Sequence, residues 1–96
     1  MEARLIIPTV HAQERAEKRG ITRKMVSDTI NYGEKIHKQG LEYFVMLKKC
    51  IQDEWDSSYS DRVVHTTVII GDDSIVTVYK NRKAFKNIRK KSKRLQ

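Results

Sequence analysis

The sequence predicts an α+β fold: two N-terminal helices packed on a four-stranded antiparallel sheet, followed by a basic C-terminal tail that can form a helix. Two capped helical segments near the N-terminus, alternating β-branched runs between residues 34 and 80, and a run of cations after residue 80 support this prediction. The 96 residues, 39% hydrophobic and 33% charged, have the length and composition of one small globular domain. We therefore expect a single domain over residues 1–81 and a tail over residues 82–96.

Each of the two helices has a start signal and a stop signal. We expect the helices at residues 10–19 and 23–32, with a threonine before each and a glycine after each. These capping residues are Thr9, Gly20, Thr22 and Gly33. The second helix has an apolar stripe with which to pack, formed by Met25, Val26, Thr29 and Ile30. The short joint between the helices predicts a compact helical corner.

The hydrophobic period changes from helical to alternating after residue 33. We expect a short strand at residues 34–38, a turn at Gln39 and Gly40, and a longer strand from Leu41 to about Ile51. The segment QDEWDSSYSD is polar and predicts a loop. The runs RVVHTTVII and SIVTVY flank the turn GDDS, and this pattern indicates a β-hairpin.

The GDDS turn also predicts a register for this hairpin. Pairing the residues on either side of the two aspartates places Val68 opposite Thr77 and Thr66 opposite Tyr79. These four side chains would then share one face of the sheet. A bulge at the turn would reverse the assignment.

The formal charge of +8 is concentrated at the C-terminus. Residues 80–96 hold nine of the 20 Lys and Arg and no acid, so residues 1–79 carry eleven cations against all twelve Asp and Glu, a net charge of −1. The tail has two interpretations: an RNA-binding or phosphate-steering arm, or a solvated basic terminus.

The cysteine and two of the three histidines have mainly structural interpretations. Cys50 is expected to be a small buried residue in a strand, because a lone cysteine cannot form an internal disulfide. His37 is expected on an edge strand and His65 on an apolar strand face. Their spacing matches no zinc motif, so we predict neither a metal nor another cofactor. The sequence shows neither a signal peptide nor a membrane span, and a cytoplasmic location is expected.

The first helix carries a basic, titratable stripe opposite a stripe of alanines. His11, Arg15 and either Lys18 or Arg19 recur at one-turn spacing, while the alanines allow a close approach to the sheet. An imidazole that shuttles a proton beside a permanent cation is what phosphodiester transfer without a metal requires. The alternative is an ordinary solvated helix surface.

Three segments, HAQERAEKRGIT, VSDTINYGE and IVTVYKN, resemble a family of small bacterial domains, domain of unknown function family 4258. Its members carry a pattern similar to His-Ala-x-x-Arg-x-x-x-Arg-Gly-Ile, a glycine after the second helix, and Thr-x-Tyr in the last strand. The resemblance spans roughly residues 9–81. That family in turn resembles the fold group of barnase, the tRNA-cleaving colicins and the RelE-type toxins, which are metal-independent ribonucleases.

The resemblance implies a role for each matching residue. His11 would be the general base or acid, Arg15 would hold phosphate, and Thr77 and Tyr79 would orient the scissile phosphate or support proton transfer. Arg19 would serve either the fold or an RNA contact. With the tail cations it completes the nucleic-acid-binding set that we expect: Arg19, Lys80, Arg82, Lys83, Lys86, Arg89 and Lys90.

Three functional hypotheses follow from these patterns. The first is a toxin-like RNA endonuclease that cleaves by metal-independent 2′-hydroxyl transesterification. The second is a non-catalytic nucleic-acid-binding or accessory protein, whose tail grips phosphate. The third is one half of a two-protein pair of the toxin and antitoxin kind. The implied partners are RNA, either tRNA or mRNA, and an acidic antitoxin or immunity protein.

Overall fold

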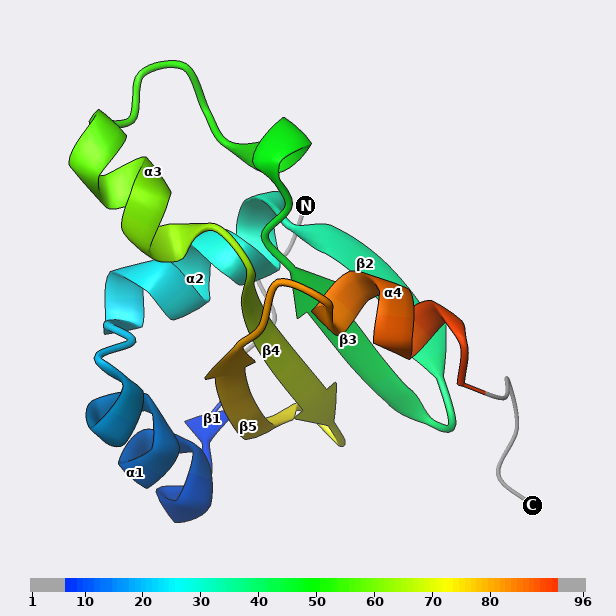
Figure 1. The fold of residues 1–96 in the computed structure, drawn as a ribbon. Coiled ribbons are helices and arrows are strands. Elements are labelled where there is room, and N and C mark those ends of the chain that lie inside the picture. The colour runs from blue at the N-terminus through cyan, green and yellow to red at the C-terminus, as the bar shows by residue number, and fades with distance from the viewer. Residues whose placement is uncertain (1–6, 92–96) are drawn as a thin grey trace.

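The computed structural model describes residues 7–91 and confirms the α+β class and the four-stranded antiparallel sheet (Figure 1). A fifth strand of two residues, β1, pairs parallel with β5, and the order across the sheet is β1-β5-β4-β3-β2. The strands are β1 (Ile7–Pro8), β2 (Glu34–Lys38), β3 (Leu41–Val45), β4 (Thr66–Gly71) and β5 (Ser74–Lys80). The helices are α1 (Val10–Arg19), α2 (Arg23–Tyr32), α3 (Ser57–Val63) and α4 (Ala84–Arg89), with a 3₁₀ turn η1 (Lys48–Cys50).

Helices α1 and α2 have the bounds that their caps predict. The Thr9 side chain accepts a hydrogen bond from the Ala12 N–H at 3.1 Å, and Thr22 does the same for the Met25 N–H at 3.2 Å. Gly20 ends α1 in the left-handed conformation, with φ of +67°, where its backbone N–H bonds back to the last turn. The chain therefore turns sharply from α1 into α2.

The segment between β3 and β4 differs from the prediction. The predicted strand from Leu41 to Ile51 stops at Val45, and η1 then turns Cys50 into the core. The predicted loop contains most of α3, a short helix whose Val63 is fully buried and whose Tyr59 packs on the same core. Its apolar residues are only one turn apart within a polar stretch, too short a pattern to predict a helix.

The predicted register of the β4–β5 hairpin is wrong because a β-bulge interrupts it. Ile70 pairs with Ile75, but Ile69 pairs with Thr77, which leaves Val76 as the extra residue on β5. Beyond the bulge Tyr79 lies opposite Thr67, not Thr66. Thr77 and Tyr79 therefore lie on the face of the sheet opposite to the one predicted.

The sheet has a core on each face. One core lies under α1, α2 and α3 and contains the buried side chains Ala12, Ile21, Met25, Phe44, Met46, Cys50, Val63, Val68, Ile70, Ile75 and Val78. The other lies under α4, which crosses β3 in Figure 1, and contains Tyr43, Val45, Ala84 and Ile88. We call this second side the α4 face. No helix among residues 7–91 is long and apolar enough to cross a membrane.

Candidate functional site

Helix α1 lies along the edge of β5 that the short strand β1 leaves uncovered. Ala12, only 2% exposed, faces the core, and Ala16 packs beside it, as expected of a small-residue stripe. The Arg19 guanidinium Nη1 donates a hydrogen bond to the Val78 carbonyl of β5 at 3.1 Å. This contact satisfies a backbone acceptor on the sheet edge and ties the end of α1 to the strand.

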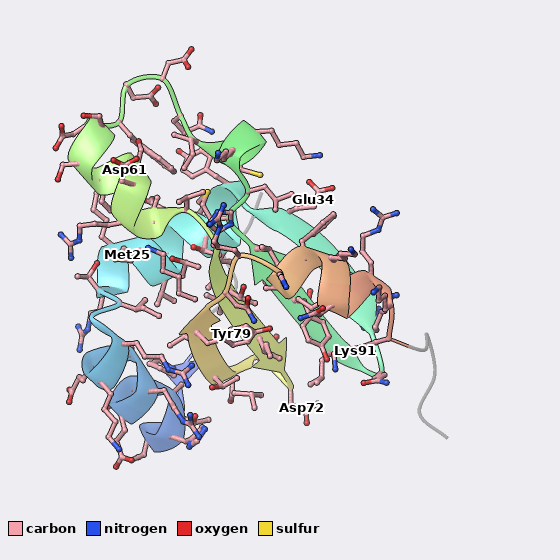
Figure 2. All side chains as sticks on the ribbon, viewed as in Figure 1. Met25, Glu34, Asp61, Asp72, Tyr79 and Lys91 are labelled. Carbon is pink, nitrogen blue, oxygen red and sulfur yellow. The ribbon has the colours of Figure 1, made fainter. Side chains whose placement is uncertain are left out.

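An open groove of about 740 Å³ lies between the polar stripe of α1 and β5. We call it the basic groove, and it is lined by His11, Arg15, Arg19, Val76, Thr77, Tyr79, Lys80 and Asn81. The structure thus brings together the four residues predicted as catalytic and two of those predicted to bind nucleic acid. Figure 2 shows Tyr79 on β5, between α1 and α4. The bulge produces this arrangement, because it turns Thr77 and Tyr79 toward the α4 face.

The cations of the basic groove form no ion pair with a carboxylate of residues 7–91. His11 and Arg15 are exposed, and no carboxylate in residues 7–91 forms an ion pair with either of them. A groove with several uncompensated cations attracts anions, and a guanidinium can bind a phosphate through two parallel hydrogen bonds.

The Tyr79 hydroxyl is suited to donating a hydrogen bond. Burial raises the pKa of Tyr79, and the neighbouring Tyr43 raises it further, while a hydrogen bond with the Thr67 side chain acts in the opposite direction. The phenol therefore stays protonated at neutral pH. It can donate a hydrogen bond to an anion in the groove, but it is a poor general base.

The other predicted nucleic-acid-binding residues lie outside the basic groove. Arg82 and Lys83 follow β5, and the rest lie on or just after α4; all are exposed. The Arg89 guanidinium stacks over the Phe85 ring at 5.5 Å. These cations sit on a helix whose Ala84 and Ile88 are buried, so the helix that carries them is packed against the domain.

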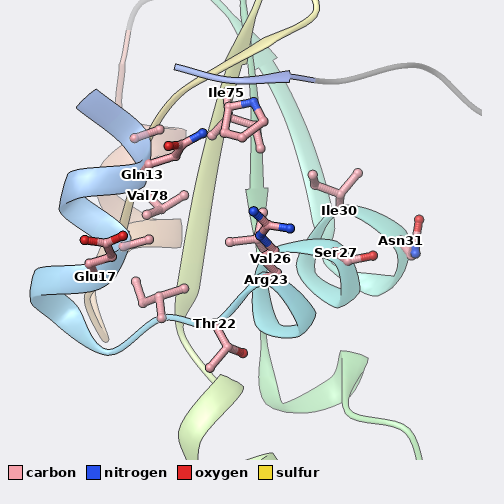
Figure 3. Close-up of a pocket in the computed structure, with 14 residues that line it drawn as sticks. Gln13, Glu17, Thr22, Arg23, Val26, Ser27, Ile30, Asn31, Ile75 and Val78 are labelled. Atoms are coloured by element: carbon pink, nitrogen blue, oxygen red, sulfur yellow. The ribbon is translucent and has the colours of Figure 1, made fainter. Parts of the chain in front are cut away.

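A second cavity, of about 620 Å³, lies between α1 and α2 (Figure 3). Its apolar walls include Ala16, Val26 and Ile75, and its ionisable lining side chains are Glu17 and Arg23. The alanine stripe of α1 and the apolar stripe of α2 contribute to its walls, and the sequence predicts both stripes as packing faces. The basic groove combines a histidine with arginines, and this cavity is lined by no histidine.

The aromatic residues of the predicted loop cover the edge of the core. Trp55 packs edge-to-face between Tyr32 and Tyr59, at ring-centroid distances of 5.4 Å and 5.5 Å. Tyr59 donates a hydrogen bond to an Asp28 carboxylate oxygen at 2.6 Å, and the Lys24 ammonium lies over its ring. These contacts give Trp55 and Tyr59 a structural role at the edge of the core.

The remaining histidines and Cys50 do not assemble into a metal site. Within residues 7–91, no three side chains of the His, Cys, Asp and Glu types lie close enough to hold an ion. His37 lies on the edge strand β2, as predicted. His65 was expected on a strand face, but it precedes β4 and has a left-handed backbone, with φ of +69°.

A protein-family model described as Domain of unknown function (DUF4258) matches residues 9–80. The chain belongs to this family. The match runs from the N-cap of α1 to the last residue of β5, so it includes seven of the eight residues that line the basic groove but none of α4. No curated protein and no solved structure matches the chain. The DUF4258 match therefore identifies the domain without assigning it an activity.

Proposed function

We propose that this DUF4258 protein is a toxin-like, metal-independent endoribonuclease whose active site is the basic groove. The observation that carries the proposal is the convergence of a histidine, two arginines and a protonated tyrosine in one groove that contains no acid. The resemblance of the family to the barnase, colicin and RelE group of ribonucleases supports the same chemistry.

The reaction would be a transesterification within the RNA strand. The His11 imidazole takes the proton from a ribose 2′-hydroxyl, and the 2′-oxygen attacks the adjacent phosphorus. The bond from phosphorus to the 5′-oxygen breaks, and the leaving oxygen takes up a proton. The products are a 2′,3′-cyclic phosphate and a 5′-hydroxyl end.

The other groove residues would act on the phosphate. Arg15 would neutralise the charge that develops on the non-bridging oxygens, and Tyr79 would donate a hydrogen bond to the same group or a proton to the leaving oxygen. Thr77, beside Tyr79 on the same face, would orient the scissile phosphate. Arg19 is held against β5, so it would position α1 and add positive potential.

Cleavage of total RNA and of tRNA, with variants of the groove, tests the proposal. We expect His11→Ala to lower the cleavage rate by roughly 10²–10⁴-fold, and Arg15→Ala or Tyr79→Phe by about 10²-fold. Mass spectrometry of the new ends should find the 2′,3′-cyclic phosphate, and a chelator should leave the rate unchanged.

Two matched variants control for unfolding and for loss of a hydroxyl. Glu14→Ala alters an exposed residue of α1 that does not line the groove. Tyr32→Phe removes the hydroxyl of a tyrosine on α2 that does not line the groove either. Both should cleave RNA at the wild-type rate. No cleavage at any protein concentration, or equal cleavage by wild type and His11→Ala, would overturn the proposal.

The second candidate is a non-catalytic nucleic-acid-binding protein. The exposure of His11 and the openness of the groove favour it, because ribonuclease active sites gain from excluding water. Such a protein would bind RNA with a strong salt dependence and leave it intact. An acidic antitoxin or immunity protein would fit the same uncompensated cations, and co-purification of this chain with its genomic neighbour tests for one.

A further inference from the structure

His65 lies where three segments that carry cations meet, next to Asn81 at the end of the basic groove. The His65 N–H donates to the Met46 carbonyl, and its own carbonyl accepts from the Asn81 N–H at 3.2 Å. These bonds hold together three segments that are far apart in the sequence: the approach to η1, the start of β4, and the end of β5. Lys48 extends from the first segment and Arg82 from the last.

These cations act on the His65 ring without an acid to offset them. Burial lowers the pKa of His65, and the charges of Arg82, Lys48 and Lys80 lower it further. The Lys80 ammonium is held by the carbonyls of Asp61 and Arg62, at the end of α3. Within residues 7–91, no carboxylate forms an ion pair with Lys48, Lys80 or Arg82.

The backbone of His65 is also unusual. A positive φ is unfavourable for a non-glycine residue, so the surrounding hydrogen bonds must hold the His65 backbone in this conformation. Thr67 adds to them, donating from its hydroxyl to the His65 carbonyl at 3.4 Å. The backbone of His65 is thereby held between the segments that carry Lys48 and Arg82.

The cluster continues the line of the basic groove. Lys80 and Asn81 line the groove at the end of β5. The Asn81 N–H donates to the His65 carbonyl, and the Lys80 charge lowers the pKa of His65. A strand lying along α1 past Arg15 and Arg19 would reach this cluster after passing Lys80. The spacing of successive phosphates on a single strand suits such a row of cations better than the scattered carboxylates of a folded acidic protein.

We propose that Lys48, His65 and Arg82 form a phosphate subsite, which holds the backbone of single-stranded RNA one or more nucleotides beyond the groove. This inference rests on the proposed function for the choice of RNA as the ligand. Lys48 and Arg82 would bind the non-bridging oxygens, and the imidazole would donate a further hydrogen bond. Neither Lys48 nor His65 was predicted from the sequence to bind nucleic acid.

Binding of 2′-O-methylated RNA separates this subsite from catalysis, because such RNA lacks the attacking hydroxyl. Two lengths are compared on the full chain, a trinucleotide and an oligomer of roughly nine nucleotides. We expect Lys48→Gln/Arg82→Gln to weaken binding of the longer RNA and to reduce the slope of log K against log salt by about 1.4. Binding of the trinucleotide in the groove should change little.

A matched double variant controls for net charge. Lys35→Gln/Lys49→Gln removes the same two charges, but these lysines pair with Glu42 and Glu34. We expect it to leave the slope for the longer RNA unchanged. His65→Asn removes the ring while keeping a residue that tolerates the left-handed backbone, and it should also weaken binding of the longer RNA.

Three outcomes would overturn the subsite. The two double variants could show equal slopes, or the longer RNA could bind no more tightly than the trinucleotide. Alternatively, Lys48→Gln/Arg82→Gln could weaken binding of a polyglutamate peptide but not of RNA. If wild type cleaves RNA but the salt slope for the longer RNA is unchanged in Lys48→Gln/Arg82→Gln, the subsite is overturned and the proposed function still stands. Lost binding in that variant without any cleavage by wild type would support the subsite and refute the nuclease.

Discussion

Two buried threonines provide a direct comparison of satisfied and unsatisfied hydroxyls. Thr29 and Thr66 are both fully buried, and Thr29 donates from its hydroxyl to the Met25 carbonyl at 2.7 Å. The Thr66 hydroxyl has no hydrogen-bond partner among residues 7–91. A buried polar group without a partner costs free energy, whereas valine fills the same volume without that cost.

We therefore expect Thr66→Val to raise the free energy of unfolding by about 1 kcal/mol, and Thr29→Val to lower it by about 1 kcal/mol. Urea denaturation of both variants beside wild type measures the two changes. A loss of stability in Thr66→Val would contradict the first expectation and indicate that solvent satisfies this hydroxyl.

His65 should make the stability of the domain depend on pH. Its pKa in the folded protein lies below the ordinary value of 6.5, so near pH 6 the unfolded chain binds more protons at this residue than the folded one. Stability should therefore fall as the pH drops through 6.5 toward the folded pKa. Burial lowers this pKa most, and the charges of Arg82, Lys48 and Lys80 act in the same direction.

His65→Asn should remove that part of the pH dependence. The measurement is the free energy of unfolding in urea between pH 5 and pH 8, for wild type and variant. Above about pH 7 the two curves should run parallel, and below about pH 6.5 the stability of wild type should fall more steeply than that of the variant. Parallel curves across the whole range would show that His65 does not titrate with a lowered pKa.

Residue spacing predicted the α1 stripe of the candidate site and missed Lys48 and His65, whereas Arg82 was predicted as one of the cations after β5. His11, Arg15 and Arg19 are one turn apart, and helical geometry alone places them on one side of α1. Lys48, His65 and Arg82 have no such periodicity. Their segments are joined by backbone hydrogen bonds from His65 to Met46, just before η1, and to Asn81, just after β5, and a left-handed histidine has no sequence signature.

At the scale of the elements, α4 is a packed part of the domain that also carries the basic charge. Ile88 is 1% exposed and lies with Ala84 against Tyr43 and Val45 of β3. We expect Ile88→Ala to lower the free energy of unfolding by about 2–5 kcal/mol, as for other large-to-small changes in a core. Thermal unfolding or urea denaturation measures it.

Asn87→Ala, an exposed change on the same helix, is the control and should alter stability by no more than about 0.5 kcal/mol. Equal stability of Ile88→Ala and wild type would mean that α4 does not dock in solution. The burial of Ile88 also affects experimental design, because deleting residues 82–96 removes core contacts together with the cations. Substitution of charges is the cleaner test of RNA binding.

The elements with strong local signals were predictable, and those decided by tertiary contacts were not. α1 and α2 follow from threonine caps and terminal glycines, which act locally. The strand β1 has two residues and exists through its pairing with β5, and α3 depends on burying Val63. The bulge at Val76 places Thr77 and Tyr79 on the face opposite to the predicted one, because one extra residue moves every later side chain of the strand to the other face.

At the scale of the whole molecule, the basic groove and α4 carry positive charge and differ in their relation to the family. The basic groove lies almost wholly within the DUF4258 match, whereas α4 and its cations lie beyond it. The chemistry of the groove would therefore belong to the domain, and the cations of α4 would add affinity for a phosphate backbone. The two contributions can be separated by changing charge without changing packing.

The triple variant Lys83→Gln/Lys86→Gln/Lys90→Gln removes three exposed cations and keeps the buried residues of α4. Its free energy of unfolding should stay within about 0.5 kcal/mol of wild type. If all three lysines contact phosphates, the slope of log K against log salt for single-stranded RNA should fall by about 2. The matched triple Lys24→Gln/Lys35→Gln/Lys49→Gln removes lysines that pair with acids, and its slope should stay unchanged. An unchanged slope in the α4 triple variant would show that these three lysines do not contact the RNA.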